Sequence, residues 1–137
     1  IGFMPQNCVL FNRTLIENIQ YGNKRKITET EVLQLLEKHN IKTFDHLDNG
    51  LKFVCGKNGN YLSGGQRQLV WFIRMYFAHP HIILLDEPTA SLDENAKDIL
   101  LRLINTLLID KTTVIITHDP YMIDNIRHVV DINSIKK

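Results

Sequence analysis

The sequence contains little cysteine, and its positive and negative charges nearly cancel. It has two cysteines among 137 residues, Cys8 and Cys55, and they form no CxxC pair. This excludes a disulfide scaffold and a CxxC-type zinc site, and it suits a reducing compartment. The 16 basic and 15 acidic side chains give a formal net charge of +1. Because there is no basic excess, we expect no nucleic-acid partner.

Long apolar runs are also missing. No unbroken apolar run approaches the roughly 20 residues that a transmembrane helix needs. The first residues, Ile1–Pro5, lack the basic region and the long apolar stretch of a signal peptide. They also lack an initiator Met, so we expect the sequence to be a fragment. The apolar fraction of 44% and the charged fraction of 23% are ordinary for one soluble globular domain.

Three short apolar segments predict the strands of a parallel sheet. They are Ile1–Met4, Ile82–Leu85 and Val114–Ile116. Their apolar residues are continuous rather than alternating, which is typical of parallel strands that are buried on both faces. A later segment, Arg127–Ile132, predicts a short edge strand.

Polar side chains follow each of these three segments. Gln6 follows the first, Asp86 and Glu87 follow the second, and His118 follows the third. Ligands bind at the carboxyl ends of strands in open parallel sheets, so these groups share one crevice if the strands are neighbours. Asp86 is then suited to hold Mg²⁺ through water, and Glu87 to orient an attacking water. Taken singly, each motif also fits solvated polar groups at a strand end.

Helices are predicted between the strands. Apolar residues spaced along Asp93–Ile109 form one continuous stripe, and Ser91 with Glu94 fits a capping box at its start. The patterns Thr14-x-x-Glu17 and Thr28-x-x-Glu31 predict two further helix starts.

The most specific motif is Leu62-Ser63-Gly64-Gly65-Gln66. Ser63 is a suitable N-cap and Gln66 completes a capping box, which predicts a helix with two glycines in its first turn. Glycine costs up to about 1 kcal/mol in a helix interior. Bare backbone, in return, lets an anion approach the free N–H groups at the positive end of the helix. The alternative is a Ser-Gly-Gly turn that caps the helix and binds nothing.

Together these motifs resemble the nucleotide-binding domain of ATP-binding cassette (ABC) transporters. Leu62–Gln66 matches the family signature LSGGQ, and Ile82–Glu87 is similar to the Walker B strand with its catalytic glutamate. Ser91–Asp93 resembles the D-loop, His118 the switch histidine and Gln6 the Q-loop glutamine. The resemblance covers most of the chain, with the motifs in the family's order.

A longer pattern, Pro5–Gly22, is similar to the Q-loop and first helical segment of multidrug and peptide exporters. Importer ATPases and soluble ABC proteins usually lack it. The resemblance implies contact with a transmembrane domain of the same or a partner chain. It also implies membrane association, with this domain on the cytoplasmic or matrix-like side. Two alternatives are a soluble ABC-type ATPase of DNA repair or translation, and a non-catalytic remnant that serves as an interaction module.

The resemblance implies a P-loop NTPase-like α/β fold: a parallel sheet core with an inserted α-helical subdomain and a missing N-terminal part. We assign 1–10 to the Q-loop strand and loop, 11–62 to the helical subdomain, and 63–137 to the signature helix and α/β core. The phosphate-cradling motif GxxxxGK[ST] is absent from the sequence. We therefore expect ATPase activity from the full-length protein and none from this chain alone.

The resemblance also implies cofactors and roles. ATP and Mg²⁺ are expected, bound between two such domains, identical or different, paired head to tail. Gln6 and Asp86 would hold Mg²⁺ and its water, Glu87 would position the attacking water, and His118 would steady the γ-phosphate. Asp93 would link the two sites. The residues expected to contact ATP on the partner domain are Ser63, Gly64, Gly65 and Gln66.

The chain departs from the family pattern in two further places. Cys55–Gly59 reads Cys-Gly-Lys-Asn-Gly where the family usually has Val-Gly-Glu-x-Gly, so Lys57 replaces an acid. After the signature the family favours Arg and small residues, and Arg74 is kept. We expect the packing of this helix to differ because of four larger apolar side chains: Leu69, Trp71, Phe72 and Met75.

Overall fold

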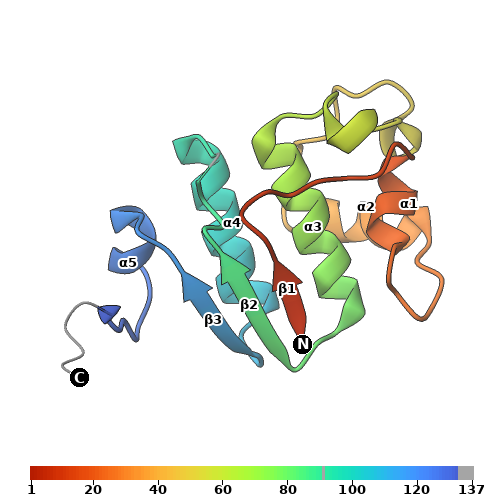
Figure 1. Ribbon diagram of the computed structural model, residues 1–137. Coiled ribbons are helices and arrows are strands. Elements are labelled where there is room, and N and C mark those ends of the chain that lie inside the picture. Colours follow the sequence, from red (N-terminus) through yellow and green to blue (C-terminus); the bar gives the residue numbers. More distant parts are fainter. Residues whose placement is uncertain (91, 133–137) are drawn as a thin grey trace.

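A three-stranded parallel sheet forms the centre of the molecule (Figure 1). The computed structural model describes residues 1–90 and 92–132. The strands lie in the order β1 (Gly2–Met4), β2 (Ile82–Asp86) and β3 (Thr112–Ile116). Both neighbouring pairs run parallel, which confirms the predicted strands and their arrangement.

Helices connect the strands of the described chain: three α-helices lie between the first and second strands in the sequence, and one lies between the second and third. Three of them begin with the predicted capping boxes, at Thr14, Thr28 and Ser63. In the described ranges, no helix has both the length and the apolar character that crossing a bilayer requires. The helical elements are α1 (Leu15–Gln20), α2 (Glu29–Lys38), η1 (Gly50–Lys52), η2 (Lys57–Gly59), α3 (Gly64–Ala78), α4 (Glu94–Leu107) and α5 (Pro120–Asp124).

Helix α4 begins at Glu94, one residue after the predicted start at Asp93. Asp93 is its N-cap, and the Asp93 carboxylate accepts a hydrogen bond from the N–H of Ala96 at 2.8 Å. Ser91 lies outside the described residues, so its capping box stays a prediction. The helix ends at Leu107, earlier than the predicted Ile109.

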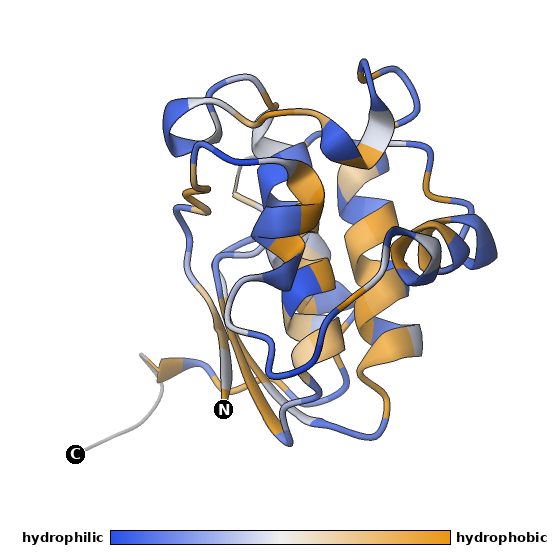
Figure 2. Cartoon of the chain, turned by 90° about the vertical axis from the view of Figure 1, so that its right-hand side faces the viewer, coloured by the Kyte–Doolittle hydropathy of each residue, from blue (hydrophilic) through white to orange (hydrophobic). Residues whose placement is uncertain are grey.

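Helices α3 and α4 lie on the same face of the sheet (Figures 1 and 2). Each crossover moves one strand in the same direction, and right-handed crossovers then place their helices on one side. The opposite face leaves four apolar side chains between 45% and 49% exposed: Phe3, Ile82, Val114 and Ile116. The expectation that the strands are buried on both faces is therefore wrong for the described chain.

The predicted edge strand Arg127–Ile132 is also wrong. These residues are neither helical nor paired as a strand over 127–131, and Val129, Val130 and Ile132 are 53%, 73% and 76% exposed. A strand needs a partner for its backbone groups, and within the described residues the sheet ends at β3. The apolar composition of this segment alone could not supply that partner.

Both cysteines are free and buried. Burial raises the pKa of Cys8 to about 12 and that of Cys55 to about 11. Both thiols are therefore protonated at neutral pH and chemically inert.

Candidate functional site

The carboxyl ends of the three strands meet at one edge of the sheet. Met4 pairs with Leu85, and Asp86 pairs with Ile116. Gln6, Glu87 and His118 follow these paired positions and therefore emerge at the same edge. The three strands are neighbours in the sheet, which is the condition under which these groups were expected to share one crevice.

Glu87 leaves the end of β2 with an unusual backbone. Its φ is +46°, in the left-handed region that residues other than glycine rarely occupy. The Glu87 N–H donates to the carbonyl of Ile116 at 2.8 Å, which ties this turn to the end of β3. Because the backbone turns here, the Glu87 carboxylate lies against the segment after β3, and its side chain is 14% exposed.

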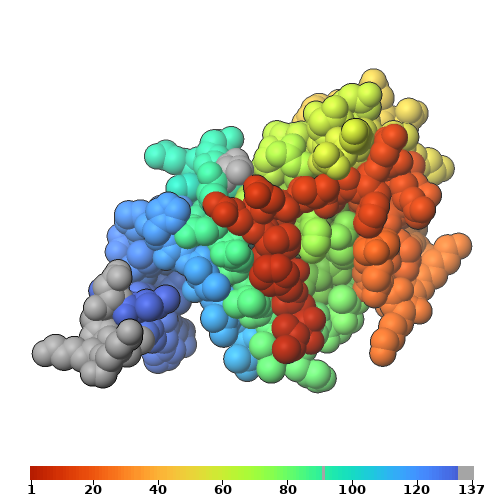
Figure 3. Space-filling view, in the orientation of Figure 1, coloured from red at the N-terminus to blue at the C-terminus, as the bar shows by residue number. Residues whose placement is uncertain are grey.

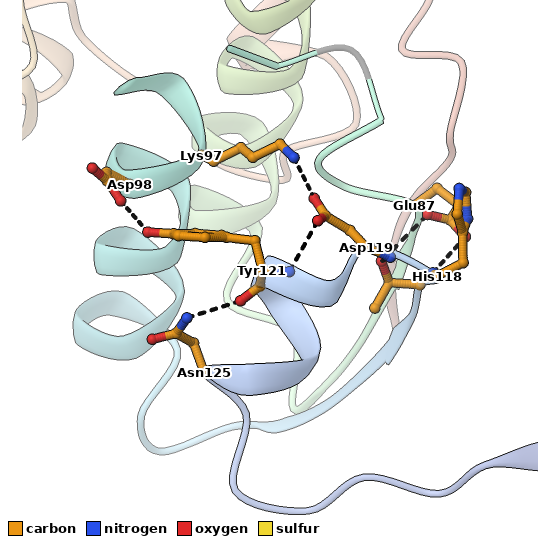
Figure 4. Close-up of polar contacts among 8 residues, drawn as sticks. Glu87, Lys97, Asp98, His118, Asp119, Tyr121 and Asn125 are labelled. Atoms are coloured by element: carbon orange, nitrogen blue, oxygen red, sulfur yellow. Dashed lines mark hydrogen bonds and ion pairs between the residues drawn. The ribbon is translucent and has the colours of Figure 1, made fainter. Parts of the chain in front are cut away.

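The Glu87 carboxylate is held by the two residues that follow β3 (Figure 4). Its Oε1 lies 2.6 Å from Nδ1 of His118 and accepts the His118 backbone N–H at 3.1 Å. Its Oε2 accepts the hydroxyl of Thr117 at 3.3 Å. The His118 side chain is 86% exposed, so it can leave this contact without disturbing the core. Sequence reasoning assigned no role to Thr117, because its contact with Glu87 depends on the sheet register.

A second polar cluster fixes the segment after His118 (Figure 4). Lys97 of α4 forms a 2.7 Å ion pair with Asp119, the N-cap of α5. The hydrogen bond from Lys97 holds the pKa of Asp119 below its usual range. The Tyr121 hydroxyl donates to Asp98 of α4. These contacts join α5 to α4 and so limit where the neighbouring His118 backbone can lie.

The signature residues form the first turn of α3. Ser63 accepts the N–H of Gln66 at 3.2 Å, and the Gln66 Oε1 accepts the N–H of Ser63 at 2.8 Å. The Gln66 amide also donates to the carbonyl of Thr43 at 3.1 Å and lies 3.2 Å from Nε2 of His46. The buried Gln66 side chain therefore has a structural role. Ser63, in contrast, is exposed at the start of the helix.

A pocket of about 370 Å³ lies between the signature turn and the start of α4. Ser63–Gln66 line one side, and Leu92, Asp93 and Ala96 line another. A Cβ placed on Gly65 would lie 3.0 Å from a methyl of Leu92, so a side chain here would crowd the pocket. The structure thus brings Asp93 together with the signature residues.

The chain between β1 and α1, residues 5–13, is called the Gln6 segment below. A second pocket, of about 420 Å³, lies between this segment and α3. It brings Gln6 together with Gly64, Arg67 and Gln68. Gln68 is only 2% exposed, and neither atom of its amide has a hydrogen-bond partner among the described residues. Sequence reasoning did not single out Gln68, because a glutamine within a helix carries no signal of burial.

The residues at the strand ends fit a cation that arrives with a nucleotide. In the described part of the chain, no three His, Cys, Asp or Glu residues form a cluster suited to a metal ion. Asp86 offers half-buried carboxylate oxygens at the end of β2, and Gln6 offers an exposed amide oxygen. Mg²⁺ is usually bound by one or two carboxylates together with substrate phosphates, and this donor set matches that arrangement.

The site thus combines a parallel sheet whose strand β2 ends at Asp86, next to Glu87, with a helix whose N-cap and first turn read Ser-Gly-Gly-Gln. The family model described as ABC transporter matches residues 1–90. The chain belongs to the ABC transporter family.

Similarity to individual ABC proteins supports this membership. The chain is 39% identical over 119 residues to a probable multidrug resistance ABC transporter ATP-binding/permease protein, YheI, of Bacillus subtilis, covering 86% of the chain and 20% of that protein. It is 37% identical over 119 residues to ABC transporter B family member 21 of Arabidopsis thaliana, which covers 86% of this chain and 9% of that protein. It is 33% identical over 131 residues to an ATP-dependent lipid A-core flippase of Nitrosococcus oceani, which covers 95% of this chain and 22% of that protein.

A solved structure, that of a bacterial Atm1-family ABC exporter with ATP bound, is similar to this fold with a TM-score of 0.77 and 32% identity. The match covers 89% of this chain and 21% of that one. The chain thus spans about a fifth of this exporter and between 9% and 22% of the three named relatives. Its homologues are exporters, and it corresponds to their nucleotide-binding part.

Proposed function

We propose that the full-length protein hydrolyses ATP to drive export of a substrate across a membrane. Support comes from the family and from relatives that are named as a multidrug resistance transporter and a lipid A-core flippase. In this proposal the domain contacts a transmembrane domain of the same or a partner chain, on the cytoplasmic or matrix-like side. The subdivision into 1–10, 11–62 and 63–137 belongs to the same proposal.

Two such domains pair head to tail in this proposal. Each ATP lies against one domain and is contacted by Ser63–Gln66 of the other. The free backbone N–H groups at the start of α3 suit a phosphate, because they point out of the helix at its positive end. Asp93 lines the same pocket as the signature turn, so it is well placed to link the two sites.

The contact between Glu87 and His118 is the observation that carries the proposed chemistry. Both Glu87 oxygens accept hydrogen bonds, so the carboxylate has a fixed orientation from which it can orient an attacking water. His118 is exposed and can turn to donate to a γ-phosphate oxygen. Gln6 and Asp86 would hold Mg²⁺, which when bound neutralises charge on the phosphates. Fixed dipoles and positioning, rather than covalent catalysis, lower the barrier.

The test is Glu87→Gln in the full-length protein. The amide keeps the shape of the side chain but is a far weaker base, so the ATPase rate should fall by about a hundredfold or more. ATP binding, measured by nucleotide trapping, should be retained. Glu37→Gln on the exposed surface of α2 serves as the matched control and should leave turnover unchanged. Near-normal turnover of Glu87→Gln would contradict the assigned role.

A further inference from the structure

Trp71 of α3 contacts the Gln6 segment. It is one of the four large apolar residues found where the family favours Arg and small residues. Residues 5–13 leave β1 and cross the surface of α3 on the way to α1 (Figures 1 and 3). The indole Nε1 of Trp71 donates to the carbonyl of Val9 at 3.0 Å. Val9 is three residues from Gln6, so this bond joins the Gln6 segment directly to α3.

Arg74, one turn further along α3, holds the Trp71 ring in place. Its guanidinium carbon lies 4.4 Å from the centre of the Trp71 ring and 5.6 Å from that of Tyr21, within range of a cation–π interaction. Arg74 is only 8% exposed, and its Nε donates to the carbonyl of Asn18 at 2.7 Å. A buried, bonded guanidinium restricts the rotamers of the indole that lies against it.

The same network holds the far end of the segment. The Asn18 side chain accepts the N–H of Phe11 at 2.9 Å and donates to its carbonyl at 3.1 Å. The segment is therefore fixed at Met4 by the sheet, at Val9 by Trp71 and at Phe11 by Asn18. Gln6 lies between the first two of these points, so the Val9 contact limits how far its backbone can move.

We propose that Trp71 is a positioning residue for Gln6, which it fastens to the helix that carries the signature turn. Gln6 and Ser63–Gln66 then move together whenever α3 moves against the sheet. This inference rests on the proposed role of Gln6 toward Mg²⁺. It does not require Trp71 to touch nucleotide, since the indole acts through the backbone of Val9 alone.

The test is Trp71→Phe in the full-length protein, which keeps a ring over Arg74 and removes the N–H donor. Val9 is half exposed, so water can replace the lost donor and the fold should persist. Hydrogen–deuterium exchange without nucleotide should be about fivefold faster in peptides covering residues 6–10, since one hydrogen bond of ordinary strength is lost. Exchange in β2 should not change. Tyr76→Phe, on the same helix but in contact with Phe77 and His79, is the matched control and should match wild type.

The catalytic readout is the Mg²⁺ concentration for half-maximal ATPase activity. In Trp71→Phe this concentration should rise about fivefold, because a more mobile Gln6 weakens Mg²⁺ binding. The kcat at saturating Mg²⁺ should stay within about twofold, because the chemical step is not affected. A purely structural role would lower kcat and leave the Mg²⁺ dependence unchanged, and that result overturns the inference. Unchanged exchange at residues 6–10 overturns it too. Exchange does not depend on turnover, so an inactive wild-type protein would refute the proposed function and leave the Trp71 contact testable.

Discussion

At the level of single residues, Glu87 shows how the site depends on structure that is distant in sequence. A non-glycine residue at φ +46° carries a cost of about 1 to 3 kcal/mol. The bonds of Glu87 to Ile116, Thr117 and His118 offset this cost, and all three partners lie about 30 residues away. The sequence motif places a carboxylate at a strand end, but only the sheet register shows which groups orient it.

Asn18 is the buried polar residue whose loss should cost most stability. It is fully buried, and its side chain bonds the backbone of Phe11 and the carbonyl of Thr14. Asn18→Ala leaves these buried groups without partners, so the free energy of unfolding should fall by roughly 2–4 kcal/mol. Urea unfolding followed by the fluorescence of Trp71, the single tryptophan, measures this. Asn7→Ala, at an exposed position of the same segment, should change stability by less than about 0.5 kcal/mol.

The ion pair between Lys97 and Asp119 predicts a pH-dependent contribution to stability. Lys97 lowers the pKa of Asp119 in the folded state, whereas an unfolded Asp titrates near pH 3.9. The stabilisation is therefore fully present above about pH 4 and is lost as pH falls through the lower folded pKa. Lys97→Met should reduce the free energy of unfolding by up to about 1 kcal/mol at pH 7. The difference from wild type should shrink below about pH 4.

Denaturant unfolding at several pH values provides the measurement for this ion pair. Lys24→Met, at an exposed position before α2, serves as the matched control because it removes the same charge elsewhere. A difference between Lys97→Met and wild type that persists unchanged to pH 2 would show that Asp119 is not the group involved.

At the scale of whole elements, helix starts were the most predictable features. The boxes at Thr14, Thr28 and Ser63 each need only residues three positions apart, so local sequence determines them. The capping-box pattern named Ser91 as the cap of α4, and Asp93, which is the N-cap in the structure, was not considered. The segment Arg127–Ile132 was wrongly predicted as a strand, because strand formation depends on a neighbour that apolar composition does not specify.

Two of these caps allow structural and functional effects to be separated. Ser63→Ala and Thr28→Ala each remove the oxygen that accepts the N–H of the third helical residue, so each should cost about 1 kcal/mol of stability. Only Ser63 lines the pocket beside Asp93. In the full-length protein, Ser63→Ala should therefore lower ATPase activity by at least about tenfold, as loss of one preorganised donor does. Equal activity of the two variants would show that the Ser63 hydroxyl serves the helix alone.

At the scale of the molecule, three apolar segments were enough to predict a parallel sheet, but they did not predict the order of its strands or the exposure of its two faces. Continuous apolar strands are typical of sheets covered on both sides. Here both crossover helices lie on one face, as the handedness of the connections requires. The apolar character of Phe3, Val114 and Ile116 leads us to expect that this face is covered in the whole protein. The chain spans about a fifth of the exporter structure that it matches.

This exposed face leads to a prediction that compares two lengths of the protein. Val114→Lys should change the stability of the 137-residue chain by less than about 1 kcal/mol, because Val114 is already 49% exposed there. In the full-length protein the same change should cost at least about 2 kcal/mol, since burying valine contributes that much and a buried charge adds more. Urea unfolding of the chain and limited proteolysis of the full-length protein provide the two measurements. Leu33→Lys, on the exposed side of α2, should have the same small effect in both contexts. If Val114→Lys behaves like this control, water reaches that face of the sheet in the whole protein as well.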